Sequence, residues 1–231
     1  TDQFNINING GWNHHLFHYD GGAFTDGEYR SDDKMSYIGG NADFKYNKGK
    51  LTFNTRFSGN ERLGQSLVAS KYQDDFSYSG QNFFSELYNH YSISENISFT
   101  AGIQFENQKM GAKSLPWGGT EMQEDLNKKK TKLKSFDAFA NVNLKYDFLN
   151  LDAGARMTDH SKFGNHWVYS LNPYVLKELE TLYFKLGYSY STAFIAPTLY
   201  QTYGSLPYVL PNFELEPETN SSHEIDLSLG K

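Results

Sequence analysis

The chain has 231 residues, enough for one large domain or two small ones, and β-barrels commonly reach this length as a single unit. It contains no cysteine, which excludes a disulfide framework and any thiolate metal site. Its net charge of -6 at pH 7 argues against a duplex nucleic-acid binder, because such proteins need a cationic face.

Aromatic residues are abundant for so polar a chain: 17 Tyr, 18 Phe and 3 Trp accompany a mean hydropathy of -0.65. No stretch approaches the roughly 20 apolar residues of a transmembrane helix. A barrel strand, however, crosses a membrane with about 9 to 11 residues, half of which can be polar. The first residues, TDQFNINING, lack the features of a signal peptide, so any export signal is expected upstream.

Period-two alternation predicts about ten β-strands. In residues 135–146, for example, Phe136, Val142 and Leu144 share one face, whereas Asp137 and Asn141 share the other. The predicted strands are residues 4–18, 35–46, 50–58, 82–93, 97–106, 135–146, 149–158, 167–176, 182–191 and 222–230.

The connections between these strands alternate between short and long. Short turns are predicted at residues 47–49, 94–96, 147–148 and 177–180, and long connections at 19–34, 59–81, 107–134, 159–166 and 192–221. Strict alternation puts all short turns at one end of an antiparallel up-and-down meander. Outer-membrane barrels show this asymmetry, so the predicted fold class is all-β, about ten strands of a transmembrane β-barrel.

A soluble up-and-down barrel or β-sandwich is the alternative, since its strands also alternate. The membrane interpretation is favoured by rings near strand ends, as in interfacial girdles, and by a polar opposite face that suits a wet lumen. These rings are Tyr46, Phe57, Tyr91, Phe105, Tyr146, Phe148, Trp167 and Tyr190. The two interpretations differ in whether Phe136, Val142 and Leu144 form a closed core.

The stretch YSYSTAFIAPTLYQTYG, residues 188–204, is followed by PNFELEPETNSSHEIDLSLG, residues 211–230. Together they resemble the late-barrel signature of TonB-dependent outer-membrane receptors. Phe213 stands where that family usually has proline. The matching residues are Ser191, Phe194, Ala196, Pro197, Leu199, Tyr203, Asn212, Leu215, Pro217, Glu218 and Glu224.

Residues 153–191 are similar to the corresponding part of the BtuB-type cobalamin (vitamin B12) transporters, although siderophore receptors carry related segments. The matching residues are Arg156, Asp159, Ser161, Phe163, Gly164 and His166. The resemblance implies a bacterial outer-membrane importer of cobalamin or a related corrinoid, with a ferric-siderophore receptor as the alternative. It also implies energy delivered by TonB through a plug inside a barrel of about 22 strands. Residues 1–231 are then expected to be a middle-barrel fragment that lacks the plug and the C-terminal strands.

Four aromatic residues are candidates for a ligand-binding surface in the loops: Trp117, Tyr200, Tyr203 and Tyr208. The alternative role for these rings is packing of the loops on themselves. Pro197 and Pro217 are predicted to fix the entry and exit of the last long loop. No catalytic motif is recognisable, so an enzyme is not expected.

A calcium site is a further possibility, in the acidic segment YDGGAFTDGEYRSDD. Its candidate ligands are Asp20, Asp26, Asp32 and Asp33, and the alternative is a solvated acidic loop. The cobalamin-transporter resemblance also implies calcium-binding loops in this region. His14, His15 and His18 are poor metal ligands together, because neighbours on a strand point to opposite faces and His14 and His18 stand roughly 13 Å apart.

The lysine-rich segment NKKKTKLK, residues 127–134, lies at the predicted outer end of a strand. In a membrane barrel these lysines could contact lipopolysaccharide phosphates, because basic clusters near membranes bind anionic lipids. A solvated charge run is the alternative.

Overall fold

The computed structural model describes residues 3–20, 27–204 and 210–230, and these residues form one 11-stranded antiparallel sheet. Neighbouring strands follow chain order, except that the short β6 pairs only with β5. The predicted antiparallel meander is therefore confirmed. The strands are β1 Phe4–Tyr19, β2 Tyr29–Tyr46, β3 Gly49–Val68, β4 Lys71–Ser94, β5 Ile97–Ser114, β6 Gln123–Leu126, β7 Lys132–Tyr146, β8 Leu149–His160, β9 Gly164–Glu178, β10 Tyr183–Ile195 and β11 Glu218–Gly230.

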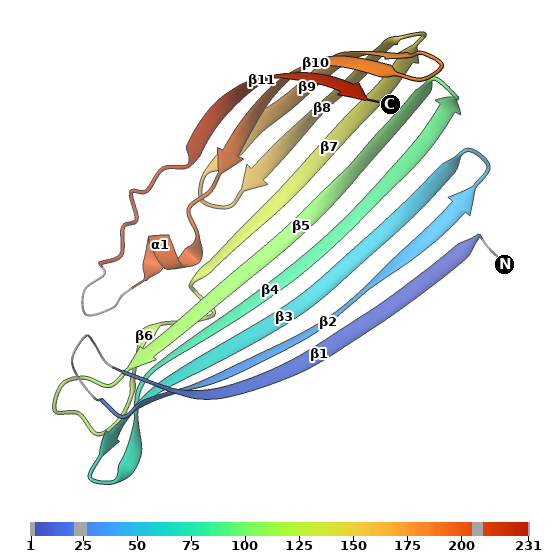
Figure 1. Ribbon diagram of the computed structural model, residues 1–231. Coiled ribbons are helices and arrows are strands. Elements are labelled where there is room, and N and C mark those ends of the chain that lie inside the picture. The colour runs from blue at the N-terminus through green and yellow to red at the C-terminus, as the bar shows by residue number, and fades with distance from the viewer. Residues whose placement is uncertain (1–2, 21–26, 205–209, 231) are drawn as a thin grey trace.

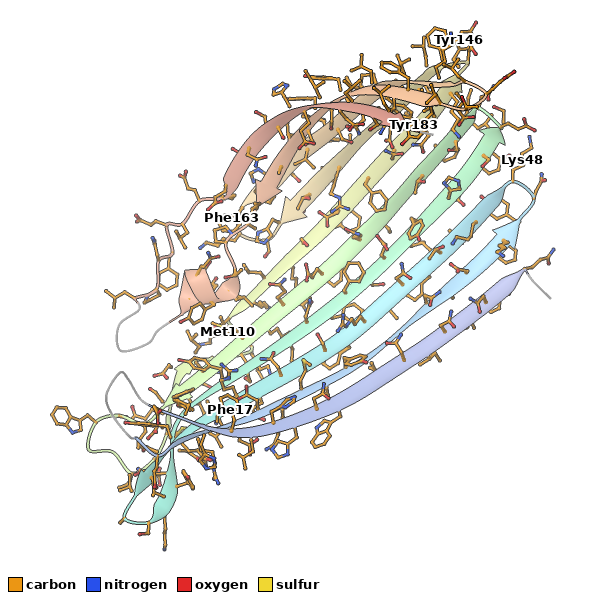
Figure 2. All side chains as sticks on the ribbon, viewed as in Figure 1. Phe17, Lys48, Met110, Tyr146, Phe163 and Tyr183 are labelled. Atoms are coloured by element: carbon orange, nitrogen blue, oxygen red, sulfur yellow. The ribbon has the colours of Figure 1, made fainter. Side chains whose placement is uncertain are left out.

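The sheet curves into an open gutter, and the five-residue helix α1, Leu199–Tyr203, lies in its hollow (Figure 1). Strands β1 and β11 are the two edge strands of this sheet. Lys48, Tyr146 and Tyr183 lie at the end with the short turns, whereas Met110 and Phe163 lie toward the end with the long loops (Figure 2). No helix of the described residues is long and apolar enough to span a membrane.

The strand register separates apolar from polar side chains across the whole sheet. Residues paired in an antiparallel ladder point to the same face. One row of paired residues is Phe53, Leu87, Ile103, Ala138 and Met157. The adjacent row, on the other face, is Asn54, Glu86, Gln104, Asp137 and Thr158. A one-residue slip in any strand would exchange the two faces, so this pattern fixes the register.

The polar face lines the hollow and is cross-linked by hydrogen bonds between side chains of different strands. Asn54 Nδ2 donates to Glu86 Oε2 at 2.9 Å, and Gln104 Nε2 donates to Glu86 Oε1 at 2.5 Å. The hydroxyl of Thr158 donates to a carboxylate oxygen of Asp137. Carboxylates on this wall are therefore held by amides and hydroxyls of the neighbouring strands.

The apolar face is not sealed into a core. The buried apolar side chains of the described residues are Ala112, Leu133 and Leu199, whereas Ile8 is 77% and Phe136 is 42% exposed. The soluble interpretation required Phe136 to lie in a closed interior, and it does not. So large an apolar surface is unfavourable in water, and it suits contact with hydrocarbon.

The predicted long connection at residues 59–81 is wrong. Strands β3 and β4 continue through this region and are joined only by Ala69 and Ser70, whose φ values are 48° and 65°. Figure 1 shows the two strands reaching beyond their neighbours at the long-loop end. Beyond the apolar belt both faces of these strands carry polar residues, so the period-two pattern fades although the ladder continues.

Other long connections are shorter than predicted for the same reason. Strand β2 begins at Tyr29, and the β8–β9 turn comprises only residues 161–163. The predicted loop 107–134 holds the end of β5, the four residues of β6 and the start of β7. The short turns at the opposite end are confirmed at residues 47–48, 95–96 and 147–148.

Candidate functional site

The signature segment folds inward, onto the polar wall of the hollow. Thr198 caps α1: its Oγ1 accepts a hydrogen bond from Gln201 N at 3.2 Å, and Gln201 Oε1 accepts one from Thr198 N at 2.8 Å. Leu199 and Thr202 are buried on the face of α1 that contacts the sheet. A side chain at Gly204 would place its Cβ 2.4 Å from Tyr200 O, so the helix ends where only glycine fits.

A cavity of about 1050 Å³ lies between α1 and the wall formed by β2 to β5. It combines aromatic and thioether surfaces with charged groups. Its lining includes Asp33, Arg62, Phe76, Tyr78, Met110 and Tyr200. A cavity of this size and mixed lining can hold a large organic ligand, because ligand pockets typically measure about 300 to 1000 Å³.

Arg62 and Asp33 form an ion pair in this lining. Arg62 Nε donates to both carboxylate oxygens of Asp33 at 3.0 and 2.9 Å, and Arg62 Nη2 donates to Oδ2 at 2.5 Å. Ser31 Oγ donates to Oδ1 at 2.6 Å. The hydrogen bonds from Arg62, opposed by partial burial, lower the pKa of Asp33 below its ordinary range. The cavity wall thus carries a fixed, neutralised charge pair.

A second hollow of about 280 Å³ lies where β10 leads into α1. Signature residues Phe194, Ala196 and Pro197 line it together with Glu106 and His160. The remaining signature residues Asn212, Leu215, Pro217 and Glu218 lie on the return to β11, where Asn212 Oδ1 accepts a hydrogen bond from Glu214 N at 3.0 Å. The signature therefore shapes an inward fold of the chain.

The residues similar to cobalamin transporters hold the β8–β9 hairpin and its contact with β10. The His166 ring stacks on Phe194 with centroids 3.9 Å apart, and its Nε2 lies 2.9 Å from Phe163 O. Gly164 has a φ of 76°, and Arg156 lies over the Phe139 ring at 5.4 Å. Ser161 Oγ accepts a hydrogen bond from the backbone N–H of Lys134 on β7 at 2.9 Å. These contacts explain the residues structurally and identify no ligand.

His160 completes this hairpin. Its Nδ1 accepts hydrogen bonds from the backbone N–H groups of Lys162 and Phe163, both at 3.3 Å. Burial, followed by the nearby His166, lowers the pKa of His160. Nδ1 can accept a hydrogen bond only when it carries no proton, so these contacts require a neutral His160 ring.

The four candidate ligand aromatics are placed very differently. Tyr200 lines the large cavity and is half exposed, whereas Tyr203 packs edge-on against Phe213 with centroids 5.6 Å apart. Trp117 is fully exposed in the β5–β6 connection. Tyr208 lies outside the described residues. Sequence reasoning missed Tyr78 and Met110, which line the cavity from parts of β4 and β5 that were predicted to be long loops.

The candidate calcium ligands do not converge where the structure describes them. Asp32 and Asp33 point to opposite faces of β2: Asp32 Oδ1 lies 3.0 Å from His14 Nε2, and Asp33 pairs with Arg62. Asp20 is exposed, and Asp26 lies outside the described residues. No three His, Cys, Asp or Glu side chains within residues 3–20, 27–204 and 210–230 are grouped to hold a metal ion. The calcium site stays a prediction.

Comparisons with known proteins identify the family to which this chain belongs. The family model described as "TonB dependent receptor-like, beta-barrel" matches residues 1–230. The siderophore receptor PirA from Acinetobacter baumannii superposes with a TM-score of 0.71 at 17% identity, covering 100% of this chain and 39% of that one. A mutant of the ferric enterobactin receptor PfeA from Pseudomonas aeruginosa gives 0.61 at 14% identity, covering 87% and 32%.

The copper transporter OprC gives a TM-score of 0.56 at 9% identity, covering 98% of this chain and 46% of that one. The chain thus spans less than half the length of these three proteins, and such low identities show the fold alone. The match to the family model extends over almost every residue. The chain therefore belongs to the TonB-dependent receptor-like β-barrel family of bacterial outer-membrane proteins.

Proposed function

We propose that the chain supplies wall strands and outer loops of an outer-membrane importer for a large, scarce ligand. The observation that carries this proposal is the cavity of about 1050 Å³ between α1 and the polar wall. An importer needs a hydrophilic interior for its cargo and an apolar exterior for the membrane, and the two faces of the sheet have these properties. The structural neighbours named above include a siderophore receptor and a copper transporter, which agrees with import of a metal or of a metal complex.

Ferric siderophores and cobalamin are the two ligand classes that we propose to test. The siderophore class is suggested by the likeness to the siderophore receptor PirA and the ferric enterobactin receptor PfeA. Cobalamin is suggested by the sequence similarity over residues 153–191, although His166, Gly164 and Arg156 have structural roles in that segment. The rings and thioether of Phe76, Tyr78, Met110 and Tyr200 would provide apolar contacts to either class.

In the whole protein, import would be driven by energy that TonB delivers. A globular plug inside the closed barrel would contact TonB and rearrange when the ligand is bound. Residues 1–231 would then act as part of the barrel domain, with the plug and further strands supplied by the rest of the receptor. The polar wall that is cross-linked by Glu86 would be the surface along which the plug packs.

The test is ligand binding to the intact receptor, measured by fluorescence quenching with a panel of ferric siderophores and with cyanocobalamin. One class should bind with submicromolar affinity. Tyr200→Ala should weaken that binding about tenfold, because its half-exposed ring lines the cavity.

Tyr146→Ala is the matched control, since this exposed aromatic residue lies at the short-turn end, away from the cavity (Figure 2), and the affinity of this variant should stay within twofold of wild type. Equal losses in Tyr200→Ala and Tyr146→Ala, or no binding of either ligand class, would contradict the proposal.

A further inference from the structure

The guanidinium that lines the cavity between α1 and the wall is already bound to a carboxylate. Arg62 Nε and Nη2 both donate to the carboxylate of Asp33, at distances of 2.5 to 3.0 Å. Ser31 Oγ donates to the same carboxylate at 2.6 Å. These hydrogen bonds lower the pKa of Asp33, so it is ionised at neutral pH and the pair has no net charge. A ligand in the cavity therefore meets a salt bridge instead of a free guanidinium.

Amide side chains form the part of this wall that lies deeper in the hollow. Asn82 Nδ2 donates to Glu106 Oε1 at 2.8 Å, and Gln108 Nε2 donates to the same oxygen at 2.9 Å. Asn82 and Gln108 also line the cavity. In the part of the chain that the structure describes, the ion pairs join other residues, so Glu86 and Glu106 have no cationic partner there. These two carboxylates repel an anion that enters the hollow.

Two lysines also border the cavity, but their side chains belong to the other face of the sheet. Neighbouring residues on a strand point to opposite faces. Lys34 Nζ lies 3.5 Å from Asp32 Oδ1, on the face opposite to Asp33. Lys109 follows Gln108 on β5, and Gln108 lies on the polar wall. Both lysines therefore direct their ammonium groups away from the hollow.

The other two arginines of the polar wall lie over aromatic rings, away from the cavity. Arg56 Cζ is 5.2 Å from the centroid of the Tyr37 ring, and Arg156 Cζ is 5.4 Å from that of the Phe139 ring. The lining of the cavity includes neither arginine. Arg62 is thus the guanidinium that a ligand in this cavity can contact.

The remaining lining suits an uncharged organic surface. Rings and thioethers provide dispersion contacts, and amide groups both donate and accept hydrogen bonds. The lining residues of these kinds include Met35, Asn60, Phe76, Tyr78, Met110 and Tyr200. Such a wall matches a metal complex whose outer surface consists of amide and hydrocarbon groups.

We propose that the cavity selects metal complexes without net negative charge, and that Asp33 is the residue that sets this selectivity. The proposal rests on the importer function proposed above and narrows its cargo. A free Arg62 would bind the oxygens of an anionic complex through its forked N–H donors, but Asp33 already accepts them. An anionic complex must displace Asp33 and also approaches Glu106, whereas a neutral complex meets neither obstacle.

Fluorescence quenching of the intact receptor in detergent tests this selectivity with three probes. Ferrichrome, a ferric trihydroxamate, and cyanocobalamin are uncharged, whereas ferric enterobactin is a trianionic tris-catecholate. The wild type should bind one of the uncharged probes at least tenfold more tightly than ferric enterobactin. Asp33→Asn frees Arg62, so the ratio of the two affinities should shift at least tenfold toward ferric enterobactin. Adding Arg62→Gln to Asp33→Asn should reverse this shift.

Asp32→Asn is the matched control, because it makes the same charge change at the neighbouring residue on the opposite face of β2. It should leave the ratio of affinities within twofold of wild type. Heat-modifiable migration on gels verifies that every variant is a folded barrel.

Three results would overturn the role of Asp33: a wild type that prefers ferric enterobactin, an unchanged ratio in Asp33→Asn, or an equal shift in Asp32→Asn. Binding of ferric enterobactin alone would leave the importer function in place and remove the charge selectivity. Binding of none of the three probes would instead overturn the importer function on which the proposal rests.

Discussion

The stack of His166 on Phe194 joins the β8–β9 hairpin to the start of the signature segment. Such an aromatic pair contributes about 0.5 to 1.5 kcal/mol beyond the area that it buries. His166→Ala should therefore loosen the segment that leads into α1, and protease cleavage between residues 196 and 217 should accelerate about fivefold, the ratio that corresponds to roughly 1 kcal/mol. His15→Ala, which removes an unstacked histidine from the same wall, should leave the cleavage rate unchanged. A rate unaffected by His166→Ala would show that the stack does not hold the segment.

The pair between Arg62 and Asp33 should make stability depend on pH on the acid side. The hydrogen bonds from Arg62 lower the pKa of Asp33 in the folded protein, so the pair stabilises the fold above the ordinary carboxyl value near 3.8. This stabilisation is lost as the pH falls through the lowered pKa. Because Arg62 is largely solvated, the contribution at pH 7 should be below about 1 kcal/mol.

In urea unfolding of the receptor in detergent, Arg62→Gln should lower the midpoint slightly at pH 7. The difference from wild type should shrink as the pH falls through the lowered pKa of Asp33 and vanish once this carboxyl is protonated in the folded protein. A difference that persists or grows at low pH would mean that the pair is not its source.

At the scale of elements, the alternation of apolar and polar residues predicted every strand that crosses the apolar belt, and the short turns between them. It failed where β3 and β4 leave this belt, because Tyr72 to Gln81 place polar groups on both faces. The turn at Ala69 and Ser70 carries no glycine or asparagine that would have revealed it. The inward course of the signature segment was also beyond sequence reasoning, since it depends on the hollow that the curved sheet provides.

The backbone of the β3–β4 turn is unfavourable for the two residues that form it. Ala69 and Ser70 both have positive φ, a conformation that costs about 1 to 2 kcal/mol for residues with a Cβ and that Asn-Gly adopts readily. Replacing the two residues with Asn-Gly should stabilise the hairpin tip by about 1 to 2 kcal/mol and slow amide hydrogen exchange there about tenfold. Ser79→Gly, in the middle of β4, should accelerate exchange instead. Faster exchange at the tip of the Asn-Gly variant would contradict the turn geometry.

At the scale of the whole molecule, the orientation of the two faces decides which substitutions the membrane tolerates. Ala140 and Asn141 are neighbours on β7, but Ala140 lies on the apolar face and Asn141 on the polar wall, where its Nδ2 donates to Asp152 Oδ1 at 2.5 Å. Ala140→Arg should destabilise the barrel by about 2 to 4 kcal/mol, because it places a cation in hydrocarbon. Asn141→Arg should be tolerated, since it meets water and a carboxylate. Urea unfolding in lipid vesicles measures both, and equal effects would mean that the faces are assigned the wrong way round.

The chain leaves the sheet at Ile195 and rejoins it at Glu218, and these two residues are partners in the ladder between β10 and β11. The helix α1 lies on the chain between these two residues and pairs with no strand. Its movement away from the wall would therefore break no inter-strand hydrogen bond, although it would expose Leu199 and Thr202, which are buried in the closed arrangement.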